Sequence, residues 1–74
     1  MNIGNEDEAR AAIASWRGEP ARAQLRNLQL AMEKLELGQM YYEQKGNDQG
    51  AARLGRCMTM LAERRAEVED QLPG

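Results

Sequence analysis

Side chains able to carry chemistry are few in this sequence, and histidine is absent. Nucleophilic catalysis needs a Ser, Cys, Thr or Lys activated by a base, and without histidine that base would have to be a carboxylate or a lysine. Cys57 stands near the edge of an apolar helical pattern, where we expect a buried, inert thiol. A single cysteine allows no internal disulfide, and without histidine it cannot build a zinc site within one chain.

Two pairs of carboxylates recur at helical spacing, Glu33 with Glu36 and Glu63 with Glu67. Each pair would share one helix face, where it could bind a hard cation or act as acid and base. The same spacing is typical of a solvated helix surface, and Lys34 follows Glu33 in such a pattern. We therefore predict that the protein is not an enzyme and uses no metal and no cofactor.

Three arginines and a tyrosine form a candidate binding site for a phosphate-bearing ligand. Guanidinium groups bind phosphate in a bidentate manner, and tyrosine rings stack on bases. The residues of this candidate anion site are Arg53, Arg56, Arg64 and Tyr42. Nearby glutamates can neutralise the arginines, which weakens the case for this site. An oligomeric protein that sequesters a nucleotide or another phosphate-bearing anion is therefore our alternative hypothesis and not our main one.

The elements that must position these residues begin with a short amphipathic helix over about residues 6–17. Asn5 and Glu8 form a capping pair at its start. Its apolar face recurs at helical spacing in Ala9, Ala12, Ile13 and Trp16. We expect Gly18 to end this helix in the left-handed conformation, and Pro20 to open the next one.

Two longer helices are predicted over about residues 20–45 and 49–72. Gly46 breaks the pattern as a helix end, and Asn47 or Asp48 is the next cap. Each helix carries a seam whose members alternate steps of four and three residues, which is heptad spacing. The seams consist of Ala21, Leu25, Leu28, Met32, Leu35, Gln39 and Tyr42, and of Ala51, Leu54, Met58, Leu61, Arg65, Val68 and Leu72. The sequence thus predicts a single all-α domain over residues 1–74, with a long antiparallel helical hairpin.

The helix over about residues 20–45 has apolar residues on its other side as well, so it requires further cover. The short first helix can shield one end of this face but is too short to reach Tyr41. A chain of 74 residues buries only about 60% of its unfolded surface, and we predict that a helical-bundle homo-oligomer supplies the missing burial. The predicted interface residues are Leu30, Leu37, Met40, Tyr41, Met60 and Arg65. Arg65 occupies a seam position, where it either pairs with a partner helix or extends its stem across the core to water.

Charge and hydropathy narrow the classes of partner. The net charge of −2, with acids and bases interleaved, does not favour nucleic acid. No apolar run approaches the roughly 20 residues of a membrane span, and residues 1–18 lack a secretory signal pattern. We expect a cytoplasmic, non-enzymatic protein–protein interaction module, acting as an inhibitor, adaptor or chaperone. The preference for arginine over lysine and the abundant alanine indicate a phage or bacterial origin.

Overall fold

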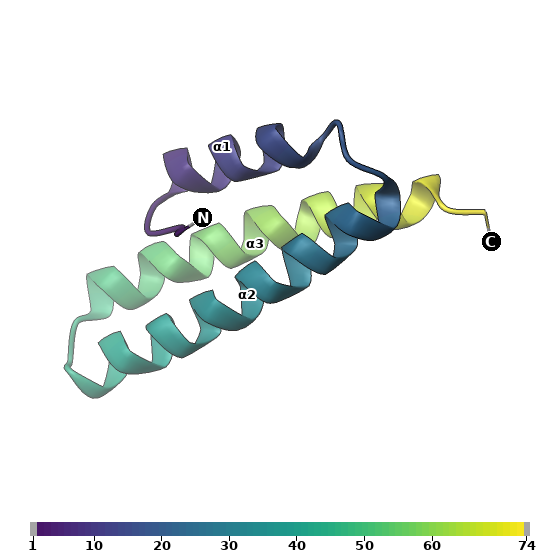
Figure 1. Ribbon diagram of the computed structural model, residues 1–74. Coiled ribbons are helices and arrows are strands. Elements are labelled where there is room, and N and C mark those ends of the chain that lie inside the picture. The colour runs from purple at the N-terminus through teal and green to yellow at the C-terminus, as the bar shows by residue number, and fades with distance from the viewer. Residues whose placement is uncertain (1, 74) are drawn as a thin grey trace.

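The computed structural model describes residues 2–73 and contains three helices in this range (Figure 1). They are α1 (Glu6–Trp16), α2 (Ala21–Gln44) and α3 (Asp48–Gln71). Every helix end lies within one residue of its predicted position, and the prediction of an all-helical chain is confirmed. Met1 and Gly74, the two ends of the predicted domain, lie outside the described residues.

The start of α1 follows the predicted capping pattern. The Asn5 side chain accepts a hydrogen bond from the Glu8 backbone N–H at 2.8 Å, and the Glu8 carboxylate accepts one from the Gly4 N–H at 2.7 Å. These contacts satisfy backbone donors that the first helical turn leaves without partners. They also fix the segment before α1, residues 2–4, against the helix.

The end of α1 differs from the prediction. Gly18 is not left-handed, because among the described residues Gly46 alone has a positive φ, at 73°. Arg17 stays right-handed and donates its N–H to the Ala14 carbonyl, and Glu19 N–H donates to the Trp16 carbonyl at 2.9 Å. The helix therefore closes with tight i to i−3 hydrogen bonds and does not use the conformational freedom of glycine.

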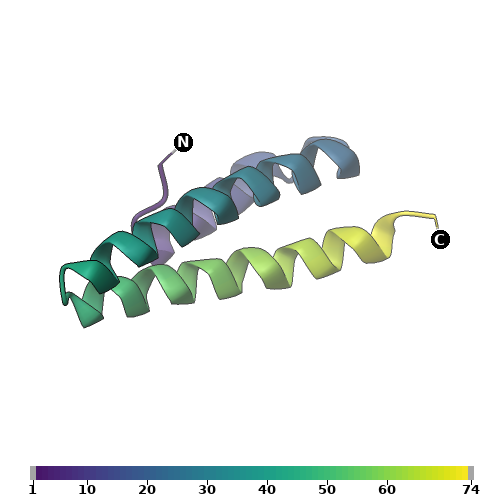
Figure 2. The ribbon, with the colours of Figure 1, turned by 90° about the horizontal axis from the view of Figure 1, so that it is seen from below.

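A short turn joins α2 to α3. Gly46 takes the left-handed conformation that only glycine adopts at little cost. Asn47 caps α3 by accepting a hydrogen bond from the Gly50 N–H at 2.9 Å. With this turn the two long helices lie side by side along their lengths (Figure 2).

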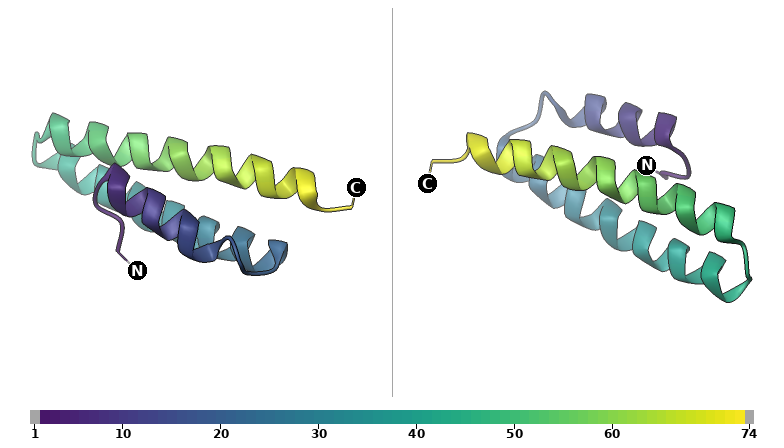
Figure 3. Two further views of the ribbon diagram at one scale, coloured as in Figure 1. Left: turned by 90° about the horizontal axis from the view of Figure 1, so that it is seen from above. Right: turned by 180° about the vertical axis from the view of Figure 1, so that it is seen from behind.

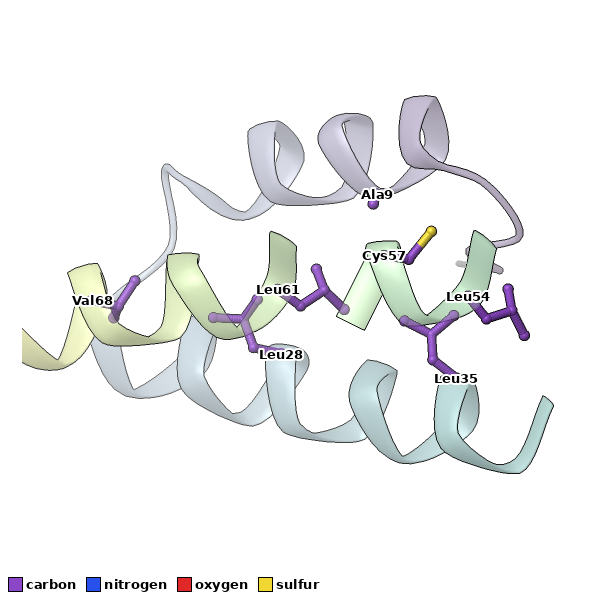
Figure 4. Close-up of a cluster of buried hydrophobic side chains, with 7 residues drawn as sticks. All are labelled: Ala9, Leu28, Leu35, Leu54, Cys57, Leu61 and Val68. Atoms are coloured by element: carbon purple, nitrogen blue, oxygen red, sulfur yellow. The ribbon is translucent and has the colours of Figure 1, made fainter. Parts of the chain in front are cut away.

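Helix α3 lies between α1 and α2 in the front and back views (Figures 1 and 3). The buried cluster is accordingly built around it, from Ala9, Leu28, Leu35, Leu54, Cys57, Leu61 and Val68 (Figure 4). Leu28 lies beside Leu61 and Leu35 beside Leu54, whereas Cys57 points toward α1. The sequence left the first helix to shield one end of the outer face of α2. In the structure α1 packs mainly on α3, and its Trp16 lines a hollow together with Leu30 of α2.

Two glycines let α2 approach α3 closely near the turn. A methyl group at Gly38 would lie 2.8 Å from Leu54 Cδ1, and one at Gly50 would lie 2.8 Å from the Tyr42 ring. Both distances are shorter than carbon atoms tolerate, so a larger residue at either position would require the neighbouring side chain or helix to shift. Because position 38 carries no side chain, α2 fills little space next to the N-terminal segment.

Candidate interaction face

Four large apolar side chains on α2 remain exposed, and all four were predicted as interface residues. Leu30 is 52% exposed, Leu37 67%, Met40 50% and Tyr41 56%. Leu30, Leu37 and Tyr41 recur at steps of seven and four residues and so form one line along the helix, with Met40 at its flank. We call these four residues the outer stripe.

Charged residues border the outer stripe in an ordered way. Lys34 lies on the same line, four residues after Leu30 and three before Leu37, which completes a heptad pattern. Among residues 2–73 no carboxylate lies within ion-pair distance of Lys34. Glu33 flanks the line, is exposed, and accepts a hydrogen bond from Gln29 at 3.0 Å. The stripe therefore offers a cation and an anion at its centre.

The other two predicted interface residues lie on α3, away from this line. Met60 is partly buried and packs against the core cluster. Arg65 keeps 40% of its side chain exposed, 3.7 Å from Glu69 and 3.4 Å from the Gln29 side-chain oxygen. Within the single chain the Arg65 stem lies at the edge of the core and its guanidinium near Glu69 and Gln29; the alternative of pairing with a partner helix stays a prediction.

The buried arginine of α3 is Arg64, which the sequence had assigned to an anion site. Its guanidinium donates to the Gln24 side-chain oxygen at 3.0 Å and lies 3.7 Å from Glu67. Gln24 is itself buried, and its amide donates to the carbonyls of Glu19 at 2.8 Å and Arg17 at 3.3 Å. This network fastens the loop between α1 and α2 onto α3. Nothing in the apolar pattern of the sequence pointed to it.

Arg53, Arg56 and Tyr42 lie near the other end of α3 and make internal contacts. Arg53 Nε donates to the Gly4 carbonyl at 2.9 Å, and its guanidinium carbon lies 5.9 Å from the centre of the Tyr42 ring. Arg56 Nε donates to a Glu6 carboxylate oxygen at 2.9 Å and holds the pKa of that carboxyl below its usual value. Arg53 thus attaches the N-terminal segment to α3, and Arg56 attaches the start of α1 to it. The structure brings Arg53 and Tyr42 together but leaves Arg64 at a distance along the helix.

The one cysteine is buried between α1 and α3, as expected. Cys57 has no exposed surface, and burial in apolar surroundings raises the pKa of its thiol. A protonated, enclosed thiol is a weak nucleophile. Within residues 2–73 no three carboxylate or thiol groups cluster in a way that would hold a metal ion.

A hollow of about 330 Å³ opens between the N-terminal segment and α2. We call it the arm pocket, and its lining residues are Asn2, Ile3, Gly4, Ala31, Lys34, Leu35, Gly38, Tyr41, Tyr42 and Leu54. A smaller hollow lies nearer the start of α2, where Trp16 of α1 and Asn27 and Leu30 of α2 line it. The sequence missed the arm pocket, because its far wall is formed by residues that precede the first helix.

Comparison with known proteins assigns no relative to this chain. It matches no protein family, no curated protein and no solved structure. Across the described residues, none of the helices combines the length and apolar character that crossing a membrane requires.

Proposed function

We propose that this chain is a non-enzymatic protein–protein interaction module of the inhibitor, adaptor or chaperone kind. We further propose that it acts as a homo-oligomer whose copies meet through the outer stripe of α2. The observation that carries the proposal is the exposure of Leu30, Leu37, Met40 and Tyr41, each at least half exposed, on a helix whose other side is in the core. Clusters of large exposed apolar side chains mark interaction sites.

The pattern of the stripe supports a second copy as the occupant. When two α2 helices pair in opposite directions about the midpoint of the stripe, Leu30 of each copy meets Tyr41 of the other. Lys34 of each copy then packs beside Leu37 of the other and can reach its Glu33. A polar residue at a central seam position is known to fix the register and partner number of paired helices. The arrangement is an isologous dimer of two hairpins, each antiparallel, in a four-helix bundle.

The anion-binding alternative has less support. Arg53, Arg56 and Arg64 each donate to an acceptor of the same chain. Arg53 and Arg56 donate through Nε alone, but a phosphate that used Arg64 would have to displace its contact with Gln24, which holds the loop after α1. The exposed stripe carries no comparable cost, since its side chains already face solvent.

The proposal is tested by molar mass from light scattering coupled to size-exclusion chromatography, over a dilution series. The wild-type chain should have twice the 8.3 kDa monomer mass at high concentration and dissociate on dilution. The double variant Leu30→Gln with Leu37→Gln should remain monomeric with an unchanged circular dichroism spectrum, because pairing would bury two amide side chains in an apolar contact. Ala52→Gln adds the same side chain at an exposed position of α3 and should keep the wild-type mass. A wild-type mass of one chain at every concentration, or a dimeric double variant, would refute self-association through this face.

A further inference from the structure

We propose that the arm pocket binds a small amphipathic carboxylate, a molecule with an aromatic or branched alkyl body and one carboxylate group. This inference goes beyond the pairing of copies. It rests on the arm pocket, which shares Lys34 and Tyr41 with the face that pairs copies, so that a bound ligand and a second copy compete for these two residues. Its volume of about 330 Å³ is at the lower end of the roughly 300–1,000 Å³ of small-molecule sites.

The pocket is a consequence of how α2 packs on α3. Gly38 has no side chain, and a methyl group there would lie 2.8 Å from Leu54 Cδ1. Ala31, two helical turns earlier on the same side, carries only a methyl group. The space above Leu35 and Leu54 is therefore not filled from α2, and the apolar floor of the pocket stays open to a ligand.

The opposite wall of the pocket is held in place by two hydrogen bonds of Gly4, one through its backbone N–H and one through its carbonyl. The Gly4 N–H donates to the Glu8 carboxylate at 2.7 Å, and the Gly4 carbonyl accepts from Arg53 Nε at 2.9 Å. These bonds connect the segment that carries Ile3 to α1 on one side and to α3 on the other. The wall therefore exists before a ligand arrives, which lowers the entropic cost of binding.

The polar groups of the lining select the sign of the ligand's charge. Lys34 supplies a cation that no carboxylate of residues 2–73 neutralises. Tyr41 and Tyr42 supply phenols and Asn2 an amide, all of which can donate hydrogen bonds. None of the lining residues is acidic. An apolar floor with a cationic, donor-bearing rim favours a carboxylate over an amine or a neutral molecule.

The inference is tested by titrating isotope-labelled protein with 3-phenylpropionate and following backbone amide signals by NMR. Saturable shifts should appear at Ile3, Gly4 and Gly38, with a dissociation constant of about 1 mM for a ligand of this size. The neutral amide of the same acid should bind about tenfold more weakly, because it cannot form the ionic contact with Lys34. Equal binding of acid and amide would overturn the proposal.

Matched variants separate the pocket from the rest of the surface. Lys34→Met keeps the stem and removes the charge, and should weaken the acid about tenfold. Lys45→Met removes a lysine outside the pocket and should leave the affinity unchanged. Ala31→Leu fills the hollow and should abolish binding while circular dichroism stays the same. If Lys34→Met and Lys45→Met behave alike, or Ala31→Leu folds and still binds, the pocket is not the site.

The titration is repeated in the background of Leu30→Gln with Leu37→Gln, which adds no charge beside Lys34, changes no residue of the pocket lining and removes the apolar centre of the stripe. Binding that persists there shows that the site does not depend on self-association. Shifts that follow Leu30, Leu37 and Met40 and do not saturate would indicate nonspecific contact with the stripe and would overturn the pocket assignment.

Discussion

The contact between Gln24 and Arg64 gives the most quantitative prediction. Gln24→Met retains the length of the side chain but removes three hydrogen bonds, to Arg64 at 3.0 Å and to the carbonyls of Glu19 at 2.8 Å and Arg17 at 3.3 Å. It also leaves a buried guanidinium whose remaining partner, Glu67, is exposed and 3.7 Å away. Arg64 Nε has no hydrogen-bond partner among the described residues. The loss of Gln24 would therefore leave a second guanidinium nitrogen without a hydrogen bond.

The size of the effect follows from these bonds. A hydrogen bond to a charged group contributes about 1.5–3 kcal/mol and a neutral one about 1 kcal/mol, so Gln24→Met should lower the free energy of unfolding by about 3.5–5 kcal/mol. Arg64→Met leaves the buried Gln24 oxygen without its donor and should lower it by about 1–2 kcal/mol. The double variant should lose about 2 kcal/mol, because only the two loop hydrogen bonds remain missing. The resulting coupling energy is at least about 2 kcal/mol.

The assay is urea denaturation of the four proteins of this cycle, followed by far-ultraviolet circular dichroism at one fixed protein concentration. A fixed concentration is needed because the stability of an associating protein depends on it. If the double variant is as unstable as the sum of the two single variants, Gln24 and Arg64 are not coupled, and the assignment of Arg64 to a buried network is refuted.

Three further predictions concern single positions. Gly38→Val, which gains little helix propensity over glycine, should destabilise the fold by about 1–3 kcal/mol, measured by the same denaturation, because its β-carbon would lie 2.8 Å from Leu54; an unchanged midpoint would contradict this packing. Arg56→Gln should raise the pKa of Glu6 toward its ordinary value, measured by NMR titration, since Arg56 is the main cause of the lowered pKa. The contact stabilises the fold above the unfolded pKa of Glu6 and is lost as the pH falls through the folded one. Cys57 should react with a disulfide reagent only as fast as the chain opens, and labelling at the rate of a free thiol would show that it is accessible.

The sequence predicted the helices well because their signals are local. The cap at Asn5, the helix end at Gly46 and the cap at Asn47 or Asp48 depend on neighbouring residues alone. All three are present, with Asn47 as the cap of α3. The prediction of a left-handed Gly18 was wrong because a tight turn at Arg17 closes α1 before that glycine. Local patterns therefore gave the helix ends to within one residue but not the conformation of each end.

The packing of α3 was predicted less well, because it depends on which helices surround it. The expected seam and the observed one share Leu54, Leu61 and Val68, but the observed seam contains Cys57 and Arg64 where Met58 and Arg65 were expected. A heptad pattern assumes one partner helix, whereas α3 is covered by α1 on one side and α2 on the other. The buried positions shift toward α1, and a one-residue shift exchanges the buried arginine for its neighbour.

The candidate site was predicted in part for the same reason. The stripe on α2 is visible in the sequence because it breaks the expected pattern of a helix with one apolar face, and Leu30, Leu37, Met40 and Tyr41 are all exposed. The arm pocket needs the position of Ile3 against α2, which no periodicity encodes. The internal partners of Arg53 and Arg56 come from residues about fifty positions earlier in the chain, so no local pattern reveals them.

The most direct test of the central claim is an isotope-filtered NMR experiment on a mixture of labelled and unlabelled protein, which detects contacts between copies only. We expect contacts from the Leu30 methyl groups of one copy to the Tyr41 ring of the other, since in the proposed dimer the two α2 helices pair in opposite directions about the centre of the stripe. Contacts between Leu30 and Leu30 of the other copy, or none that involve the outer stripe, would contradict it.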